Sequence, residues 1–183
     1  MAAPSRIRKT TRRRNLVSLI VIIALAAAAA WAAWALQTAL VPSESMNPAL
    51  QTGDILLVRK DAYRKGRTPR RGDIVLFKRA GVSGYYVKRV IGLPGEELIA
   101  KSGYVSINGQ WLHEPYVGGE MIREWPGYLH LGEDEYFMMG DSRAHSEDSR
   151  DIGPINMTHI TGKVTAIIAP ARRRATITNP FDD

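Results

Sequence analysis

The sequence predicts a mainly β domain preceded by a single N-terminal transmembrane helix, and three observations support this prediction. Residues 16–36 form one apolar run, LVSLIVIIALAAAAAWAAWAL, in which only Ser18 is polar. After residue 41, short β-branched runs alternate with glycine and proline, as they do in all-β domains. No amphipathic helical periodicity follows the apolar run. The chain of 183 residues has room for one modest globular domain beside the helix.

The apolar run has the length of a membrane span. As a helix it would extend roughly 31 Å, close to the hydrocarbon thickness of a bilayer. Trp31 and Trp34 lie near its C-terminal end, where interfacial aromatic residues are enriched. We expect a cytoplasmic tail at 1–15, a transmembrane helix at 16–36 and an extracytoplasmic β-rich domain at 37–183. The cytoplasmic N-terminus is predicted from six basic residues: Arg6, Arg8, Lys9, Arg12, Arg13 and Arg14.

Two other interpretations of this run compete with that of a membrane anchor. A buried core helix would need a partner face, whereas this run is apolar on all sides. A cleaved secretory signal is suggested by the A-x-A pattern at Ala33 and Ala35, and by a weak twin-arginine motif at 11–13. However, the run is longer than the usual apolar core of a cleaved signal, about 7–15 residues. We therefore favour an uncleaved anchor.

Charge and composition exclude several classes of function. The net charge is +7, but six basic residues before position 15 account for most of it. Because the folded part is nearly neutral, it lacks the basic face that nucleic-acid binding requires. The chain has no cysteine, hence no disulfide or thiolate metal site, and its four histidines form no HExxH motif. The acidic loop 141–151 lacks the glycine of a calcium loop and carries arginines. We expect no metal and no cofactor.

The domain after the anchor is predicted to consist of short strands. GDILLVRK at 53–60 and GDIVLFKR at 72–79 are similar, which we interpret as two strands begun by the same turn chemistry. The dipeptide Asn108-Gly109 favours a type I′ hairpin turn. Residues 113–131 show no clear periodicity and are expected to be extended and partly ordered. The expected strands lie at 54–58, 73–77, 85–93, 135–139 and 163–169, with two hairpins in 98–112 that turn at 101–103 and 108–109.

Candidate chemistry centres on the serines of VPSESMNPAL, residues 41–50. A serine is a weak nucleophile until a base takes its proton. His145 and Asp148 could supply a triad, but they lie three residues apart in one short loop, which is an awkward alignment. Lys88 is the better base, because Tyr86, Lys88 and Val90 share one face of an apolar strand. Burial there would lower its pKa, and the competing interpretation is a lysine that snorkels to water.

Four segments, in order after the anchor, together resemble the bacterial type I signal peptidases (leader peptidases). PSESMNPAL at 42–50 is similar to the P-S-x-S-M-x-P-T-L box of that family. RGDIVLF at 71–77 is the second segment, and YVKRVIGLPGE at 86–96 is similar to the K-R-x-x-G-x-P-G-[DE] box. MGDSRAHSEDSR at 139–150 is similar to G-D-N-R-x-x-S-x-D-S-R. The departures are Ala49, Ser142 and the pair Ala144-His145.

The resemblance implies a signal-peptidase-like antiparallel β-sheet catalytic domain and roles for the matched residues. Ser45 would be the nucleophile, Lys88 the general base, and Ser146 the residue that orients Lys88. The Ser43 hydroxyl and the Ser45 backbone N–H would form the oxyanion hole. The fourth segment would be braced against the strand of Lys88 by structural ion pairs among Arg89, Asp141, Asp148 and Arg150. The substrate groove would be lined by Val41, Pro42, Met46, Leu50, Tyr86 and Val87.

The resemblance also implies substrates and a location. The substrates would be pre-proteins that emerge from the export machinery, cut after a small-x-small (A-x-A) motif by a monomer in the bacterial cell membrane. Ser45 lies nine residues past Leu36, which would place it near the outer membrane–water boundary. Two alternatives stay open: a dedicated peptidase for one substrate, such as a pilin or conjugation factor, and an inactive signal-peptide-binding module. For Arg172-Arg173-Arg174 we favour a solvated tail over contact with anionic lipid.

Overall fold

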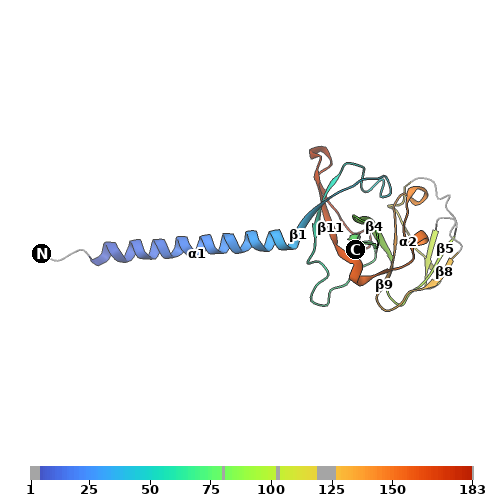
Figure 1. Ribbon diagram of the computed structural model, residues 1–183, viewed down its shortest axis with the longest axis horizontal. Coiled ribbons are helices and arrows are strands. Elements are labelled where there is room, and N and C mark those ends of the chain that lie inside the picture. The colour runs from blue at the N-terminus through green and yellow to red at the C-terminus, as the bar shows by residue number, and fades with distance from the viewer. Residues whose placement is uncertain (1–4, 80, 102–103, 119–126, 183) are drawn as a thin grey trace. The chain divides into compact units, whose positions relative to one another are not determined.

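The computed structural model describes residues 5–79, 81–101, 104–118 and 127–182, the first nine of them as backbone only. The chain divides into two compact units, Met1–Leu36 and Gln37–Asp183. In the first unit, helix α1 spans Ser5–Ala35 (Figure 1). Its segment Arg14–Ala35 is long and apolar enough to cross a membrane, and only its last residue, Ala35, is buried within the structure. The helix ends at Ala35, one residue before the predicted limit, and Leu36 begins the first strand.

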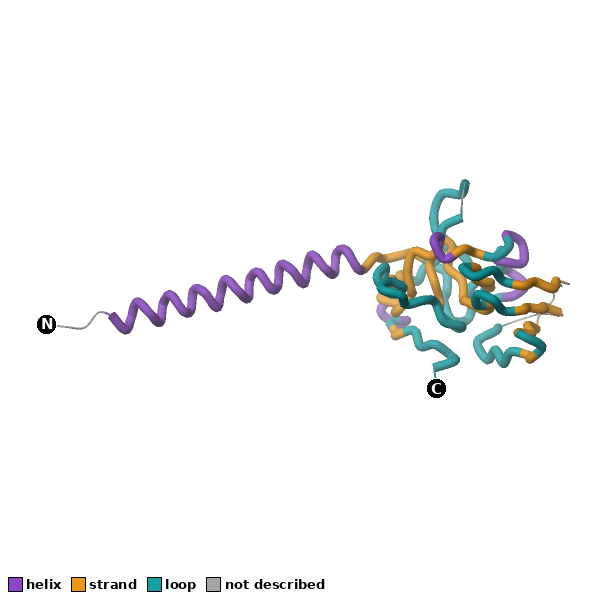
Figure 2. Tube along the Cα trace, turned by 90° about the horizontal axis from the view of Figure 1, so that it is seen from below, coloured by secondary structure: helices purple, strands orange, loops and turns teal. Residues whose placement is uncertain are grey.

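The second unit is built on two antiparallel sheets (Figures 1 and 2). The larger sheet has the order β1-β2-β11-β3-β4-β9-β10, and β12 pairs with β11. Its strands are β1 Leu36–Leu40, β2 Ile55–Arg59, β3 Ile74–Phe77, β4 Tyr86–Gly92, β9 Glu135–Met139, β10 Ile155–Asn156, β11 Ile160–Ala169 and β12 Ala175–Thr176. The smaller sheet has the order β7-β6-β5-β8. Its strands are β5 Glu97–Lys101, β6 Tyr104–Ile107, β7 Gln110–Trp111 and β8 Gly127–His130. The mainly β prediction is confirmed.

The predicted strands are found close to their expected bounds. The strand predicted at 135–139 is β9 itself, while β11 begins at Ile160, three residues before the predicted start. Asn108 and Gly109 have φ values of 49° and 81°, as the predicted type I′ turn requires. The strands β1, β8, β10 and β12 and the helix α2, Ser149–Ile152, were not predicted. Strand β8 falls in the predicted irregular segment 113–131; positions 102–103 and 119–126 lie outside the described residues.

The repeated Gly-Asp pair begins β2 and β3 by the same local structure. Gly53 and Gly72 have φ values of 89° and 87°, a region that side chains disfavour. Each following aspartate accepts a hydrogen bond from the backbone N–H three residues before it, Gln51 for Asp54 and Arg70 for Asp73. The interpretation as shared turn chemistry is therefore confirmed.

Both aspartates also hold distant segments, which corrects the expectation for the C-terminal arginines. Asp54 is buried and binds Arg173 Nε at 2.8 Å, and Arg174 Nε donates to the Ile168 carbonyl. Because a buried carboxylate needs a partner, Arg173 is part of the fold rather than of a solvated tail. In the same way, buried Asp73 binds Lys163 Nζ at 2.6 Å.

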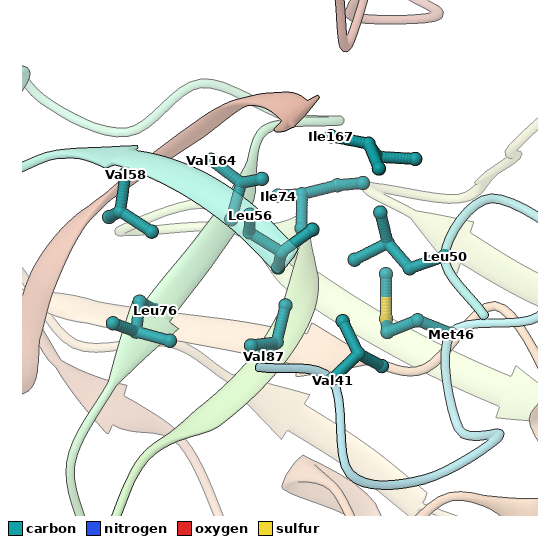
Figure 3. Close-up of a cluster of buried hydrophobic side chains, with 10 residues drawn as sticks. All are labelled: Val41, Met46, Leu50, Leu56, Val58, Ile74, Leu76, Val87, Val164 and Ile167. Carbon is teal, nitrogen blue, oxygen red and sulfur yellow. The ribbon is translucent and has the colours of Figure 1, made fainter. Parts of the chain in front are cut away.

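The segment that carries Ser45 is fixed by the hydrophobic core. Figure 3 shows Val41, Met46 and Leu50 pointing toward Leu56, Ile74, Val87 and Ile167 from the sheet. Leu50 is fully buried, and Val41 and Met46 are nearly so. Full burial of one such side chain stabilises the fold by about 1.5–3 kcal/mol. Apolar contacts on both sides of Ser45 therefore hold its turn in one position against β4.

Candidate active site

Ser45 and Lys88 meet although 43 residues separate them. Ser45 lies in a turn in which Asn47 N donates to the Glu44 carbonyl and Leu50 N to the Met46 carbonyl. Lys88 lies in the middle of β4, where it pairs with Val75 of β3. Its Nζ lies 2.7 Å from Ser45 Oγ. Ser45 is 7% exposed and Lys88 is 4% exposed. The structure therefore places a hydroxyl and an amine in direct contact away from bulk water.

Burial gives Lys88 the pKa of a usable base. Removal from water lowers the pKa of Lys88 from 10.5 to about 8, although the nearby carboxylates of Asp148 and Glu147 oppose that shift. With a pKa near 8, roughly one molecule in ten has a neutral amine at pH 7, against about one in 3,000 for an unperturbed lysine. The snorkelling interpretation of Lys88 is wrong, because the side chain is enclosed.

The histidine triad is not assembled. His145 is exposed, and its Nδ1 lies 3.4 Å from Ser142 Oγ. Asp148 instead accepts two hydrogen bonds from the Arg150 guanidinium, one from Arg150 N and one from Gly140 N. Burial by itself would raise the pKa of Asp148, but hydrogen bonds from Arg150, Gly140 and Ser146 hold it below its usual value. Asp148 is thus an ionised structural group, and it does not orient an imidazole.

The fourth segment packs directly against the nucleophile. Ser142 N donates to the Ser45 carbonyl at 3.1 Å, and Ser146 is 3% exposed. Between them lies Gly140, where an added Cβ would come within 2.3 Å of both Ser146 Oγ and the Ser45 carbonyl oxygen. Any side chain at Gly140 would therefore separate the two segments. Orientation of Lys88 by Ser146 stays a prediction, as does the oxyanion role of Ser43, whose Oγ lies 3.3 Å from Ser45 Oγ.

A buried ion pair joins the lysine strand to the fourth segment. Arg89 Nε and Nη2 bind the Asp141 carboxylate at 2.8 and 2.6 Å, and Arg89 Nη1 donates to the Gly72 carbonyl. The Arg89 guanidinium also lies 4.1 Å from the centre of the Tyr116 ring. The pair of Arg150 and Asp148 differs from the expectation, because both residues belong to the same segment. Its second contact, from Arg150 Nη2 to the Arg143 carbonyl, also stays within that segment.

Removing the acid of this pair is expected to destabilise the domain. Asp141→Ala would leave the Arg89 guanidinium, which is 3% exposed, buried without its counter-charge. The expected loss is about 3–5 kcal/mol of the free energy of unfolding, measured by chemical denaturation. The double variant Asp141→Ala/Arg89→Leu should recover part of that loss. A single variant as stable as the wild type would show that the pair does not hold these segments together.

An apolar cleft opens beside Ser45 and Lys88. It has a volume of about 400 Å³, and five of the six residues expected in the substrate groove line it: Val41, Pro42, Met46, Tyr86 and Val87. Leu50 differs, because it is fully buried in the core beside Met46 and does not line the cleft. It packs in the same core cluster as Val41 and Met46, which do line the cleft. Lining residues that the sequence did not predict are Val82, Ser83, Tyr85, His145 and Glu147.

A serine hydroxyl held against a buried lysine, at an apolar cleft in a β domain, is the arrangement expected of a serine endopeptidase. Comparison with known proteins agrees: residues 13–169 match the model of the family described as signal peptidase, peptidase S26. The chain belongs to this family. With the apolar helix α1, this membership indicates a membrane-anchored enzyme.

Individual relatives of this chain are also named as signal peptidases. The chain is 34% identical over 145 residues to "Probable signal peptidase I-2" of Synechocystis, covering 76% of this chain and 66% of that protein. It is 36% identical over 138 residues to signal peptidase I V of Bacillus subtilis, covering 68% of this chain and 81% of the relative. A crystal structure of a signal peptidase I from Enterococcus faecalis V583 aligns with 54% of this chain and 97% of its own. The TM-score of that alignment is 0.45 and the identity is 30%.

Proposed function

We propose that this protein removes N-terminal signal peptides from exported pre-proteins, cutting after a small-x-small motif with a Ser45–Lys88 dyad. The observation that carries the proposal is the 2.7 Å contact between Lys88 Nζ and Ser45 Oγ, with both side chains buried. Family membership supports signal-peptide removal. The dyad is supported by the lowered pKa of Lys88, and the preference for small residues is what the family resemblance implies.

The reaction would proceed in two halves. Neutral Lys88 takes the Ser45 proton as Oγ attacks the scissile carbonyl, and the Ser43 hydroxyl and Ser45 N–H bind the developing oxyanion. Lys88 then gives its proton to the leaving amine, so the peptide C–N bond breaks and the mature protein departs. The signal peptide remains as an ester on Ser45. Lys88 next takes a proton from water, the resulting hydroxide attacks the ester, and the proton returns to Ser45.

The substrate would lie extended in the cleft and add backbone hydrogen bonds as a strand does. The proposed orientation has the N-terminus in the cytoplasm and the catalytic domain outside it, because basic residues precede the anchor. Pre-proteins would thus meet the site as they emerge from the bilayer. A panel of unrelated pre-proteins tests the breadth of this role: a general enzyme cuts many of them, whereas a dedicated peptidase cuts one.

The pH dependence of cleavage should report the pKa of Lys88. Only the neutral amine can accept the Ser45 proton, so kcat/KM should rise with pH up to about 8 and level off above it. Below that value each pH unit should cost about tenfold, because the neutral fraction falls tenfold. Initial cleavage rates of one pre-protein from pH 5.5 to 10 measure the profile. A profile that is flat between pH 6 and 8 would exclude Lys88 as the base.

The alternative of an inactive binding module is disfavoured by the same geometry. A module that only holds signal peptides has no need of a lysine kept from water at a cost in stability. A purified chain that binds a signal peptide but never cuts it would favour this alternative.

A further inference from the structure

A second hollow adjoins the catalytic cleft, and residues before and after Ser45 in the sequence line it. It has a volume of about 620 Å³ and shares His145 with the cleft. Its lining contains neither Ser45 nor Lys88, although it includes residues next to Ser45 in sequence. The lining residues are Glu44, Asn47, Pro48, Gln51, Thr52, Gly118, Ser142 and His145. We call this hollow the leaving-group pocket.

The walls of the leaving-group pocket are tied to the catalytic turn. Ser142 N donates to the Ser45 carbonyl, and Gly118 forms a parallel bridge with Ser142. An added Cβ at Gly118 would come within 2.7 Å of Pro48 Cδ, so the wall depends on a glycine there. The pocket is thus built mainly from the two segments that position the nucleophile, with Gly118 added from a third. A molecule bound in it would lie beside Ser45.

A substrate must occupy both sides of the scissile bond. Under the proposed function, the small residues before the cut occupy the cleft that contains Ser45 and Lys88. The residues after the cut must then continue beyond Ser45, and the leaving-group pocket, which is lined by neighbours of Ser45 and shares His145 with the cleft, is near enough to receive them. We propose that this pocket binds the first residues of the mature protein, and that Glu44 makes the enzyme select against acidic residues at those positions. This inference rests on the proposed function.

The polar groups of the pocket match such a ligand. Among its described lining residues, Glu44 carries the only carboxylate, and it is exposed toward solvent. A peptide supplies backbone N–H groups, and cleavage releases an amine that becomes an ammonium by taking up a proton. Both kinds of donor suit the exposed Glu44 carboxylate, whereas a second carboxylate would be repelled by it.

Three matched pre-proteins test the inference. They are cut by the full-length enzyme in detergent at low salt, and they differ only in their first two mature residues: Ala-Ala, Ala-Lys or Ala-Glu. One pair of exposed unit charges changes affinity by about fivefold. Because Glu44 attracts the lysine and repels the glutamate, kcat/KM for Ala-Lys should exceed that for Ala-Glu by about 25-fold. Glu44→Lys should invert this ratio, and Gln51→Glu, which adds a carboxylate to the same pocket, should increase it. High salt should reduce all of these differences.

Glu133→Lys provides the control, because it makes the same charge change at an exposed residue outside the pocket lining. The ratio of kcat/KM for Ala-Lys to that for Ala-Glu should be the same in this variant as in the wild type. Unchanged ratios in Glu44→Lys and Gln51→Glu enzymes that still cut the Ala-Ala substrate would overturn the pocket assignment and leave the proposed function standing. If the wild type cuts none of the three pre-proteins, the proposed function fails instead.

Discussion

Lys88→Met is expected to abolish pre-protein cleavage while leaving the domain folded and more stable. Methionine has about the volume of lysine but cannot take the Ser45 proton, so the serine stays a weak nucleophile. General-base catalysis alone contributes about 10²–10⁴-fold, and loss of the activated nucleophile adds to that. Initial rates on one pre-protein, compared at pH 8 with those of the wild type, measure the effect.

Stability distinguishes this result from simple unfolding. Lys88 has a pKa near 8 in the folded chain and 10.5 when unperturbed, so the unfolded state binds more protons between those values. Stability of the wild type should therefore rise as pH increases from about 8 to 10.5. Removing the amine removes the cost of burying its charge. The free energy of unfolding of Lys88→Met should therefore exceed that of the wild type by up to about 3 kcal/mol at pH 7 and by little at pH 11. An active variant, or one destabilised at every pH, would contradict the assignment of a desolvated base.

Ser45→Ala is expected to have the largest effect on activity with the least effect on structure. The change removes one buried hydroxyl, and Val41, Met46 and Leu50 still hold the turn in the core. Without the hydroxyl no ester can form, and cleavage should fall by at least about 10⁴-fold, as it does when other serine proteases lose their nucleophile. The measurement is single-turnover cleavage with enzyme in excess over pre-protein.

Ser43→Ala is the matched control for this prediction. It removes a neighbouring hydroxyl that we assign to the oxyanion hole, and it should reduce the rate by about 10²–10³-fold. A Ser45→Ala enzyme that cuts faster than Ser43→Ala would exchange the roles of the two serines. Retained binding of signal peptide by Ser45→Ala would show that the cleft is intact.

Much of this site could be predicted from the sequence, because strand patterns and short motifs are local. Lys88 was placed on an apolar strand face, and the structure encloses it there. Leu50 was wrongly expected to line the substrate groove, because a residue five positions from the nucleophile can face either the cleft or the core. Only the packing of the turn against the sheet decides which (Figure 3).

Other features depended on contacts that sequence spacing does not reveal. The partner of Arg173 is Asp54, 119 residues away, so a basic cluster near the C-terminus gave no sign of an ion pair. Buried Arg143 pairs with Glu114, which lies in a segment without periodicity. Gly140 had no predicted role, because its importance depends on the close approach of Ser45 and Ser146. The short strands β10 and β12 pair through two residues each, too few to form a pattern.

The most direct test of the dyad is the identity of the residue that carries the signal peptide during turnover. Wild-type enzyme is mixed with excess pre-protein, quenched in acid within milliseconds, digested and analysed by mass spectrometry. We predict a fragment containing Ser45 that is heavier by the mass of the bound signal peptide, joined as an ester, and that is missing from the Ser45→Ala enzyme. The same added mass on a fragment without Ser45, or its persistence in Ser45→Ala, would contradict the assignment of Ser45 as the nucleophile.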